Sequence, residues 1–535
     1  MELTSRFVQE VVSPPPEVTL AGMTRNAPDL PTSAAKTCYA PKLVEARPAS
    51  EYADPEKEKA VRNRITALTY EAGHHTVYQH VTYTFALRGV SRNLIHCFLH
   101  AFPFYNTEQQ SQRYVEMKVA SVTVPPFARE EHRRLFESAV IDAWETYYRL
   151  IEALRPHVEA IYKQQLWAHR PAFAAWEEGK IDKMALEVAR YVLPIACHAD
   201  FYYTINQITL LSLNRLRRLP QVRWEADRLI GAMVEAAAKA DPGFAALLEN
   251  PLSDPYTTEG SLEALLAGKH GVAGAGQAES FDAQCDGLVS RLLSWPQVNH
   301  RGGLVGLLAD ALRLELGLPA GQGDDADLIA DLLDPARNPY LSSTLNLVPY
   351  APATQVLHHG TFTFAKRLSH TADSQNQRHR TMRGSRQLLI FGHLRRPDVV
   401  VPDLIESCPE ALRVFDAAMA RTWERINRLV DDGVPMEYAA YLYPNAKVVR
   451  LYETCDLAGL LHKANLRLCF RAQREIFEAT RQEVRQIGDL YPEVVRYFAA
   501  PCVVRHRAGR RPVCPEKKGF CGVPVWKEPE SARLL

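Results

Sequence analysis

The stretch YQHVTYTFALRGVS at residues 78–91 has a near copy, LHHGTFTFAKRLS, at residues 357–369. Four side chains recur in the same order and spacing, namely His80, Thr82, Thr84 and Phe85 in the first stretch and His359, Thr361, Thr363 and Phe364 in the second. Alternation of Thr with aromatic residues is typical of a strand with one buried face. The two stretches therefore predict two equivalent strands in a chain that contains one fold twice.

Further landmarks recur after each strand. Each half has a proline that ends an apolar run, in ARYVLP at 189–194 and AAYLYP at 439–444. Each then has an arginine-containing segment, NRLRRLPQVRWE at 214–225 and NLRLCFRAQREI at 465–476. Two copies of roughly 240 residues fit a chain of 535 residues better than four small domains. We expect an N-terminal domain at 1–245, a linker at 246–285, a C-terminal domain at 286–490 and a basic, cysteine-containing tail at 491–535.

Helical periodicity is clear in four longer segments. Apolar residues recur at helical spacing over 57–72, 129–163, 410–431 and 456–487, and we expect an amphipathic helix in each. Helices outnumber strands in this pattern. The sequence therefore predicts an α+β fold in each half, with a small and largely antiparallel sheet flanked by helices.

Composition narrows the class of protein. Hydrophobic residues make up 47% and charged residues 23%, which is the balance of a globular protein, and the net charge of +1 gives no basic field to gather nucleic acid. No apolar run approaches the roughly 20 residues that span a bilayer, and the N-terminus has no signal-peptide pattern. The ten cysteines are spread thinly without C-x-x-C, so we expect a reducing, cytoplasmic compartment.

A basic run follows the strand of the second half. It reads QNQRHR and includes Gln375, Arg378, His379 and Arg380. Arginine offers planar, bidentate donors to phosphate, and histidine adds a stacking ring, so the run suits an anionic ligand such as a nucleotide. A solvated surface loop is the alternative for any basic run. The first half has Cys97 and His100 at the matching positions and continues to a Ser-x-Arg element, Ser111 and Arg113.

Taken together, these motifs resemble the flavin-dependent thymidylate synthases. In the first half the resemblance lies in GHHTVYQHVTYTFALRGVSR, NTEQQSQRYV, ARYVLP and NRLRRLPQVRWE, and in the second half in HHGTFTFAKRLSH, QNQRHR and LRLCFRAQREI. The resemblance implies reductive methylation of dUMP, with methylenetetrahydrofolate as carbon donor and FAD, reduced by NADPH, as hydride carrier. It also implies that an arginine favours the ionised N3 of the uracil, which makes C5 nucleophilic.

The resemblance assigns roles to individual residues. The catalytic N3 arginine falls on Arg217 in the first half and on Arg467 in the second. The dUMP side falls on Gln375, Arg378, Ser111, Arg113 and Arg190. The FAD side falls on Thr76, Gln79, Asn206, Arg378, His379 and Arg380.

Neither half is complete by itself. The first half lacks Arg-His-Arg, and the second half lacks Ser-x-Arg and has Ala440 opposite Arg190. One hypothesis is complementation, with one composite site per pair of halves and a homodimer that mimics the family's homotetramer. The alternative is a catalytically inactive homologue that binds flavin or a dUMP-like nucleotide, because a fold does not guarantee its chemistry.

The tail adds two further hypotheses. Three thiols and an imidazole, Cys502, His506, Cys514 and Cys521, have the ligand types of a tetrahedral zinc site, but their irregular spacing without C-x-x-C favours unpaired cysteines in a basic tail. The arginines and lysines of the tail define a third functional class, a protein that binds nucleic acid in a salt-sensitive way. We expect neither nucleic acid nor a membrane as a partner.

Overall fold

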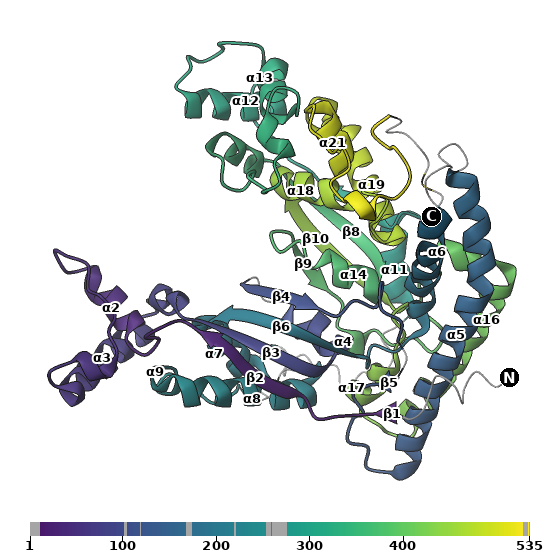
Figure 1. The fold of residues 1–535 in the computed structure, drawn as a ribbon, viewed down its shortest axis with the longest axis horizontal. Coiled ribbons are helices and arrows are strands. Elements are labelled where there is room, and N and C mark those ends of the chain that lie inside the picture. The colour runs from purple at the N-terminus through teal and green to yellow at the C-terminus, as the bar shows by residue number, and fades with distance from the viewer. Residues whose placement is uncertain are drawn as a thin grey trace.

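A computed structural model describes residues 11–100, 104–117, 119–166, 174–218, 221–252, 258, 275–527 and 533. Its framework consists of two four-stranded antiparallel sheets with the same strand order (Figure 1). The first sheet has the order β2 (Glu17–Met23), β3 (Thr82–Ser91), β6 (His198–Asn206) and β4 (Tyr105–Gln109). The second has the order β7 (Ser290–Ser294), β8 (Thr361–Ser369), β10 (Val448–Asp456) and β9 (Arg383–Arg386). The predicted α+β fold with two diverged copies is confirmed.

The two central strand pairs have the same register. Strand β3 pairs with β6 from Thr82 opposite Asn206 to Ser91 opposite His198, and β8 pairs with β10 between the corresponding residues. The first half has one extra residue, which is absorbed in a bulge after Leu87. Gly89 takes φ +68° in this bulge, a conformation that favours glycine, and its N–H donates to Asp200 at 3.0 Å.

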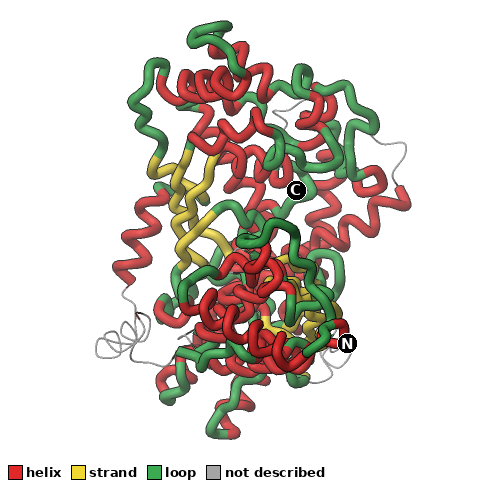
Figure 2. The backbone as a smooth tube through the Cα atoms, turned by 90° about the vertical axis from the view of Figure 1, so that its left-hand side faces the viewer, coloured by secondary structure: helices red, strands yellow, loops and turns green. Residues whose placement is uncertain are grey.

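Helices cover the sheets and join the halves. Figure 2 shows helices around both groups of strands. Helix α5 (Glu130–Leu166) lies against α16 (Pro409–Asp431) (Figure 1), and Asp142 of α5 forms ion pairs with Arg421 and Arg425 of α16. The other long helices are α3 (Pro55–Glu71), α6 (Ala174–Ala189), α7 (Gln207–Leu216), α8 (Arg223–Ala240), α11 (Ala275–Cys285), α12 (Gly303–Leu316), α18 (Leu457–Arg467) and α19 (Arg474–Gly488).

One sequence prediction is wrong in a way that matters for function. The helix expected over 456–487 is two helices, α18 and α19, separated by a turn. Both segments have amphipathic periodicity, which does not show where the chain changes direction. The break places Arg467 at the end of one helix and Gln473 at the start of the next, and both side chains reach the site described below.

The apolar runs that end in proline connect the two halves. Pro194 and Pro444 form an antiparallel β-bridge. The N–H of Ile195 donates to the carbonyl of Tyr443, and the N–H of Asn445 donates to the carbonyl of Leu193, both at 2.8 Å. The run of one half therefore pairs with the equivalent run of the other half, as expected for two copies related by a pseudo-two-fold axis.

A buried carboxylate strengthens this junction on each side. Glu225 accepts hydrogen bonds from the N–H and hydroxyl of Ser91 and from the hydroxyl of Tyr441, which belongs to the other half. Glu475 does the same with Ser369 and with Tyr191 of the first half. Burial raises the pKa of both carboxyl groups, and these hydrogen bonds oppose the shift.

The carboxylates make the halves depend on each other for stability. We predict that Tyr441→Phe lowers the free energy of unfolding by about 1–3 kcal/mol, because it removes a hydrogen bond to a buried carboxyl group. Urea denaturation followed by fluorescence and circular dichroism measures the loss. Tyr202→Phe is the control, since Tyr202 is 60% exposed and its change should cost less than about 0.5 kcal/mol. Equal stability of the two variants would contradict the prediction.

The remaining expected segments are described in part. Of the linker expected at 246–285, residues 253–257 and 259–274 lie outside the described residues. Helix α11 forms the last part of the expected linker and packs on the second sheet, where its Asp282 forms an ion pair with Arg450. In the tail, α21 (Pro501–Arg507) lies against the second half. Within the described ranges, no helix is both long enough and apolar enough to cross a bilayer.

Candidate functional site

The basic run of the second half reaches across to the first half. Ser369 caps the short helix α14 (His370–Asn376) by accepting from the N–H of Ala372, and the run continues from that helix. Arg378 donates to the carbonyl of Thr107 at 3.0 Å. Arg380 donates to the carbonyl of Tyr105 and to the side chain of Asn106. Strand β4 of the first half therefore holds both arginines of the run.

The middle residue of the run contacts the predicted catalytic arginine. Arg467 donates through Nε to Nε2 of His379 at 2.9 Å and through Nη2 to the carbonyl of Gln375 at 3.1 Å. Burial, followed by repulsion from Arg113 and Arg378, lowers the pKa of Arg467 to about 10. Burial lowers the pKa of His379 well below its usual value, so the imidazole is neutral and can accept this hydrogen bond.

Residues of both halves meet on one amide. Gln375 of the second half donates to the side-chain oxygen of Gln473, and Arg190 of the first half donates to the same oxygen at 2.7 Å. Sequence reasoning missed Gln473. It lies within the quoted segment LRLCFRAQREI, but only the turn between α18 and α19 directs it to the site.

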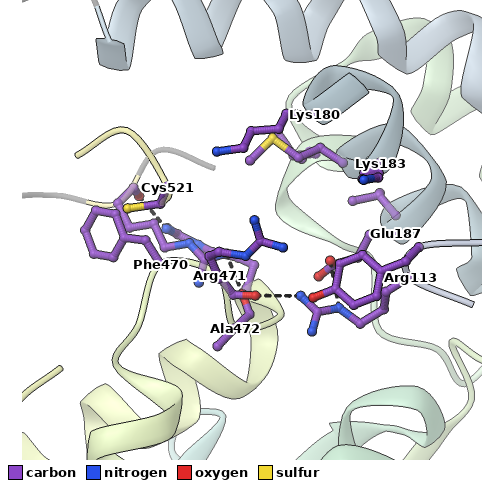
Figure 3. Close-up of a pocket in the computed structure, with 14 residues that line it drawn as sticks. Arg113, Lys180, Lys183, Glu187, Phe470, Arg471, Ala472 and Cys521 are labelled. Atoms are coloured by element: carbon purple, nitrogen blue, oxygen red, sulfur yellow. Dashed lines mark hydrogen bonds and ion pairs between the residues drawn. The ribbon is translucent and has the colours of Figure 1, made fainter. Parts of the chain in front are cut away.

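The Ser-x-Arg element also lies at the boundary between the halves. Arg113 forms an ion pair with Glu187 at 2.8 Å and donates to the carbonyl of Arg471 at 2.7 Å (Figure 3). The hydroxyl of Ser111 accepts from the N–H of Arg113, which fixes the turn. The sequence predicts Ser111 and Arg113 as phosphate ligands, and the contact of Arg113 with the second half comes from the tertiary structure.

Beside Arg113 lies a hollow of about 710 Å³, which we call the basic hollow (Figure 3). One carboxylate, Glu187, faces six cationic side chains in its lining, namely Arg113, Lys180, Lys183, Arg471, Arg474 and Arg533. Burial, with nearby Arg471 as the next cause, lowers the pKa of Lys180 to about 7. Like charges held this close are relieved by an anionic ligand, so the hollow suits a phosphate or carboxylate group.

Exchanging the roles of the two halves defines a second, equivalent set of positions. Most of the site residues are not retained at these positions. Cys97 and His100 occupy the positions of Gln375 and Arg378, and Ala440 occupies that of Arg190. Strand β9 pairs with β10 as β4 pairs with β6, and this register aligns the two edge strands. Continued beyond the strands, it puts Leu388 and Ile390 at the positions of Ser111 and Arg113. Arg217 remains but forms an ion pair with Asp227 at 3.0 Å, whereas the residue equivalent to Asp227 is Phe477. The residues that the resemblance assigns are therefore retained in one of the two pairings, that of Ser111, Arg113 and Arg190 with Gln375, Arg378 and Arg467.

The residues expected on the FAD side lie along the first sheet. Thr76 and Gln79 are exposed on the turn His75–His80, and Asn206 caps α7 by accepting from Thr209. A hollow of about 740 Å³ lies beside this sheet and is lined by Arg378, Arg380 and residues of β4 and β6, among them Thr204. Asn206 is two residues beyond Thr204 on the same strand face. The structure thus brings Arg378, Arg380 and Asn206 to one face of the sheet.

The four residues expected to bind zinc do not form a metal site in the described part of the chain. No group of three or more His, Cys, Asp or Glu side chains is placed there to hold a metal ion. Cys502 is buried, whereas His506 is exposed. Burial, followed by the neighbouring thiol of Cys469, raises the pKa of Cys502 to about 12. The cysteines at 502, 514 and 521 are free.

The basic hollow predicts a measurable affinity for phosphate. Arg113→Ala should weaken the binding of inorganic phosphate about tenfold or more, because one charge-assisted contact is worth about 1.5–3 kcal/mol. Isothermal titration with phosphate measures this. Arg413→Ala, a change at an exposed residue of α16, should leave the affinity unchanged. Equal phosphate affinity of the Arg113 variant and the wild type would show that the hollow is not an anion site.

Comparison with known proteins agrees with this arrangement. The family model described as thymidylate synthase complementing protein matches residues 19–243 and 343–493, one segment in each half. The flavin-dependent thymidylate synthase of Clostridium tetani is 31% identical over 229 residues, which are 43% of this chain and 84% of that protein. The enzyme of the same name from Geobacter sulfurreducens is 32% identical over 170 residues, which are 31% of this chain and 70% of that protein. The resemblance seen in the motifs is confirmed, and the chain belongs to the thymidylate synthase complementing protein family.

Proposed function

We propose that this chain is a flavin-dependent thymidylate synthase with one composite active site, which converts dUMP to dTMP with methylenetetrahydrofolate and NADPH. One observation carries the proposal. Arg113 and Arg190 of the first half and Gln375 of the second half donate to Arg471 and Gln473, and Arg467 donates to the carbonyl of Gln375. The halves thus complement each other, since each supplies what the other has lost.

We propose that the nucleotide lies between these side chains. Arg113 and Arg190 hold the phosphate together with the hydroxyl of Ser111, because guanidinium groups bind phosphate in bidentate fashion. Gln375 and Arg467 face the base. Arg467 has no carboxylate partner within the described ranges and is largely buried, so an anionic uracil ring would be a favourable partner for its charge. Stabilising the ionised N3 in this way raises the nucleophilicity of C5.

The residues present fit a flavin beside the nucleotide. Arg378 and Arg380 line the hollow along the first sheet and offer charge to a pyrophosphate, and the exposed Thr76 and Gln79 and the half-buried Asn206 offer polar contacts on the same half. The flavin supplies hydride chemistry when bound. His379 orients Arg467 by accepting its Nε–H, which links the two sides of the site.

Two points of assembly and activity complete the proposal. We propose that two chains pair, as a counterpart of the family's tetramer, with the exposed outer face of the first sheet around Tyr202 available for that contact. The rival hypothesis is a catalytically inactive homologue that retains nucleotide or flavin binding. Turnover separates the two hypotheses, since only the first requires it.

The two equivalent arginines provide a matched pair of variants. Arg467→Ala should lower kcat about 10²–10³-fold, because it removes the cation that stabilises the charged base. Arg217→Ala should change kcat less than about threefold, because Arg217 is already paired with Asp227 away from a complete site. Release of tritium from [5-³H]dUMP in the presence of FAD, methylenetetrahydrofolate and NADPH measures both rates.

Each outcome of this comparison has a clear meaning. Equal losses in both variants would indicate two working sites and contradict the single composite site. Full activity of the Arg467 variant would show that its residue assignment is wrong. Absence of turnover in the wild type, with dUMP still bound, would favour the inactive homologue.

Flavin binding has its own test. Arg378→His copies the residue of the first half and should lower FAD affinity about tenfold, since a guanidinium contact to the cofactor is lost. Visible absorption of the protein titrated with FAD measures the affinity. Arg413→Ala is the control with expected wild-type binding. Undiminished FAD binding by the Arg378 variant would place the flavin elsewhere.

A further inference from the structure

The lost counterpart of the active site is still a cavity. A hollow of about 1000 Å³, which we call the second hollow, lies between the first-half segment after β3 and strand β9. Its lining includes His96, Cys97, His100, Gln377, Arg383 and Arg386. Cys97 and His100 stand where the composite site has Gln375 and Arg378, so the second hollow is the equivalent of the substrate site with a different set of side chains.

The second hollow contains buried polar atoms without partners. His100 is only 6% exposed, and one of its ring nitrogens faces the side chain of Gln377 while the other has no hydrogen-bond partner. The side-chain oxygen of Gln387 and Nδ1 of His96 are also buried and unpaired. Buried polar groups are nearly always hydrogen-bonded in folded proteins, so this concentration along one cavity indicates a polar ligand.

The chemistry of these atoms matches the edge of a nucleobase. Burial, with Arg378 as the next cause, lowers the pKa of His100 to about 3, so the ring is neutral and offers one N–H donor and one acceptor. The amide oxygens add acceptors. His100 stacks on Tyr105 with ring centroids 5.0 Å apart and an angle of 10° between planes, so the ring is held in place. A base presents alternating N–H and carbonyl groups that pair with such a set.

The mouth of the second hollow carries two arginines where the first half has uncharged residues. Arg383 and Arg386 occupy the β9 positions where β4 has Asn106 and Gln109. Arg386 is neutralised by a bidentate ion pair with Asp373. Arg383 is exposed and makes no ion pair within the described ranges, so it offers its charge to a phosphate.

We propose that the second hollow is a non-catalytic binding site for a nucleoside monophosphate, with the base at His100, Gln377 and Gln387 and the phosphate at Arg383. Chemistry does not occur there, because Arg217, the equivalent of the catalytic arginine, is paired with Asp227, and apolar Leu388 and Ile390 replace the Ser-x-Arg element. The site is additional to the composite site and does not depend on turnover at that site.

The stoichiometry of nucleotide binding tests the proposal. Equilibrium dialysis of the full-length protein counts the nucleotides bound per chain, with dUMP, dTMP, dCMP, dAMP and dGMP as the probes. At least one of these probes, alone or together with a second one, should give two bound nucleotides per chain. Arg383→Glu should weaken the second binding event about tenfold or more, because a repulsive charge replaces an attractive one at an exposed residue. Arg413→Ala should keep both events unchanged.

Further variants separate the two sites. Arg467→Ala should remove dUMP from the composite site and leave the second event intact. His100→Phe should fill the second hollow and remove only that event, and its thermal unfolding is compared with that of the wild type to confirm folding. One nucleotide per chain that is lost in Arg467→Ala and kept in Arg383→Glu would overturn this inference and leave the proposed function standing. One nucleotide lost only in Arg383→Glu would support the inference and overturn the proposed substrate site.

Discussion

The mutual pairing of the segments around Pro194 and Pro444 is the constraint on which the rest of the structure depends. Two backbone hydrogen bonds run in each direction between these segments, and the buried Glu225 and Glu475 each bind a tyrosine from the opposite half. Charged or strongly polar groups in an apolar interior are tolerated only when their hydrogen bonds are complete. The halves therefore hold one fixed relation, which positions the basic run of one half on strand β4 of the other.

A fixed relation between two copies creates two equivalent sets of positions, and the residues that the resemblance assigns are retained in one of them. Duplication within a single chain allows this asymmetry, whereas identical subunits would change both sites together. The core of the second half has also diverged. Lys366, Lys463, Glu453 and Glu483 form a buried ion network, and Lys366 and Lys463 add to the positive field that lowers the pKa of His379. The first half lacks these charges, with Leu87, Tyr203, Leu213 and Met233 at the equivalent positions.

Much of the fold could be predicted from local patterns. Alternation in TYTFAL and TFTFAK correctly indicated β3 and β8, because a half-buried strand imposes a period of two residues. The long helices α5 and α16 followed from their periodicity. The break between Arg467 and Gln473 did not, since the apolar period continues on both sides of it. Spacing alone also does not reveal that Cys502 is buried and His506 is exposed, so it did not decide between the two alternatives for the tail.

The sequence by itself determined the duplicated α+β fold, the family and the identity of the basic and polar residues, since these depend on the order of side chains along the chain. Tertiary structure alone decided which residues act together. Arg190 and Gln375 are far apart in sequence and meet on Gln473, while Arg217 is neutralised by a neighbour that Arg467 lacks. Such pairings arise from the packing of one half against the other, and no local pattern records the outcome of that packing.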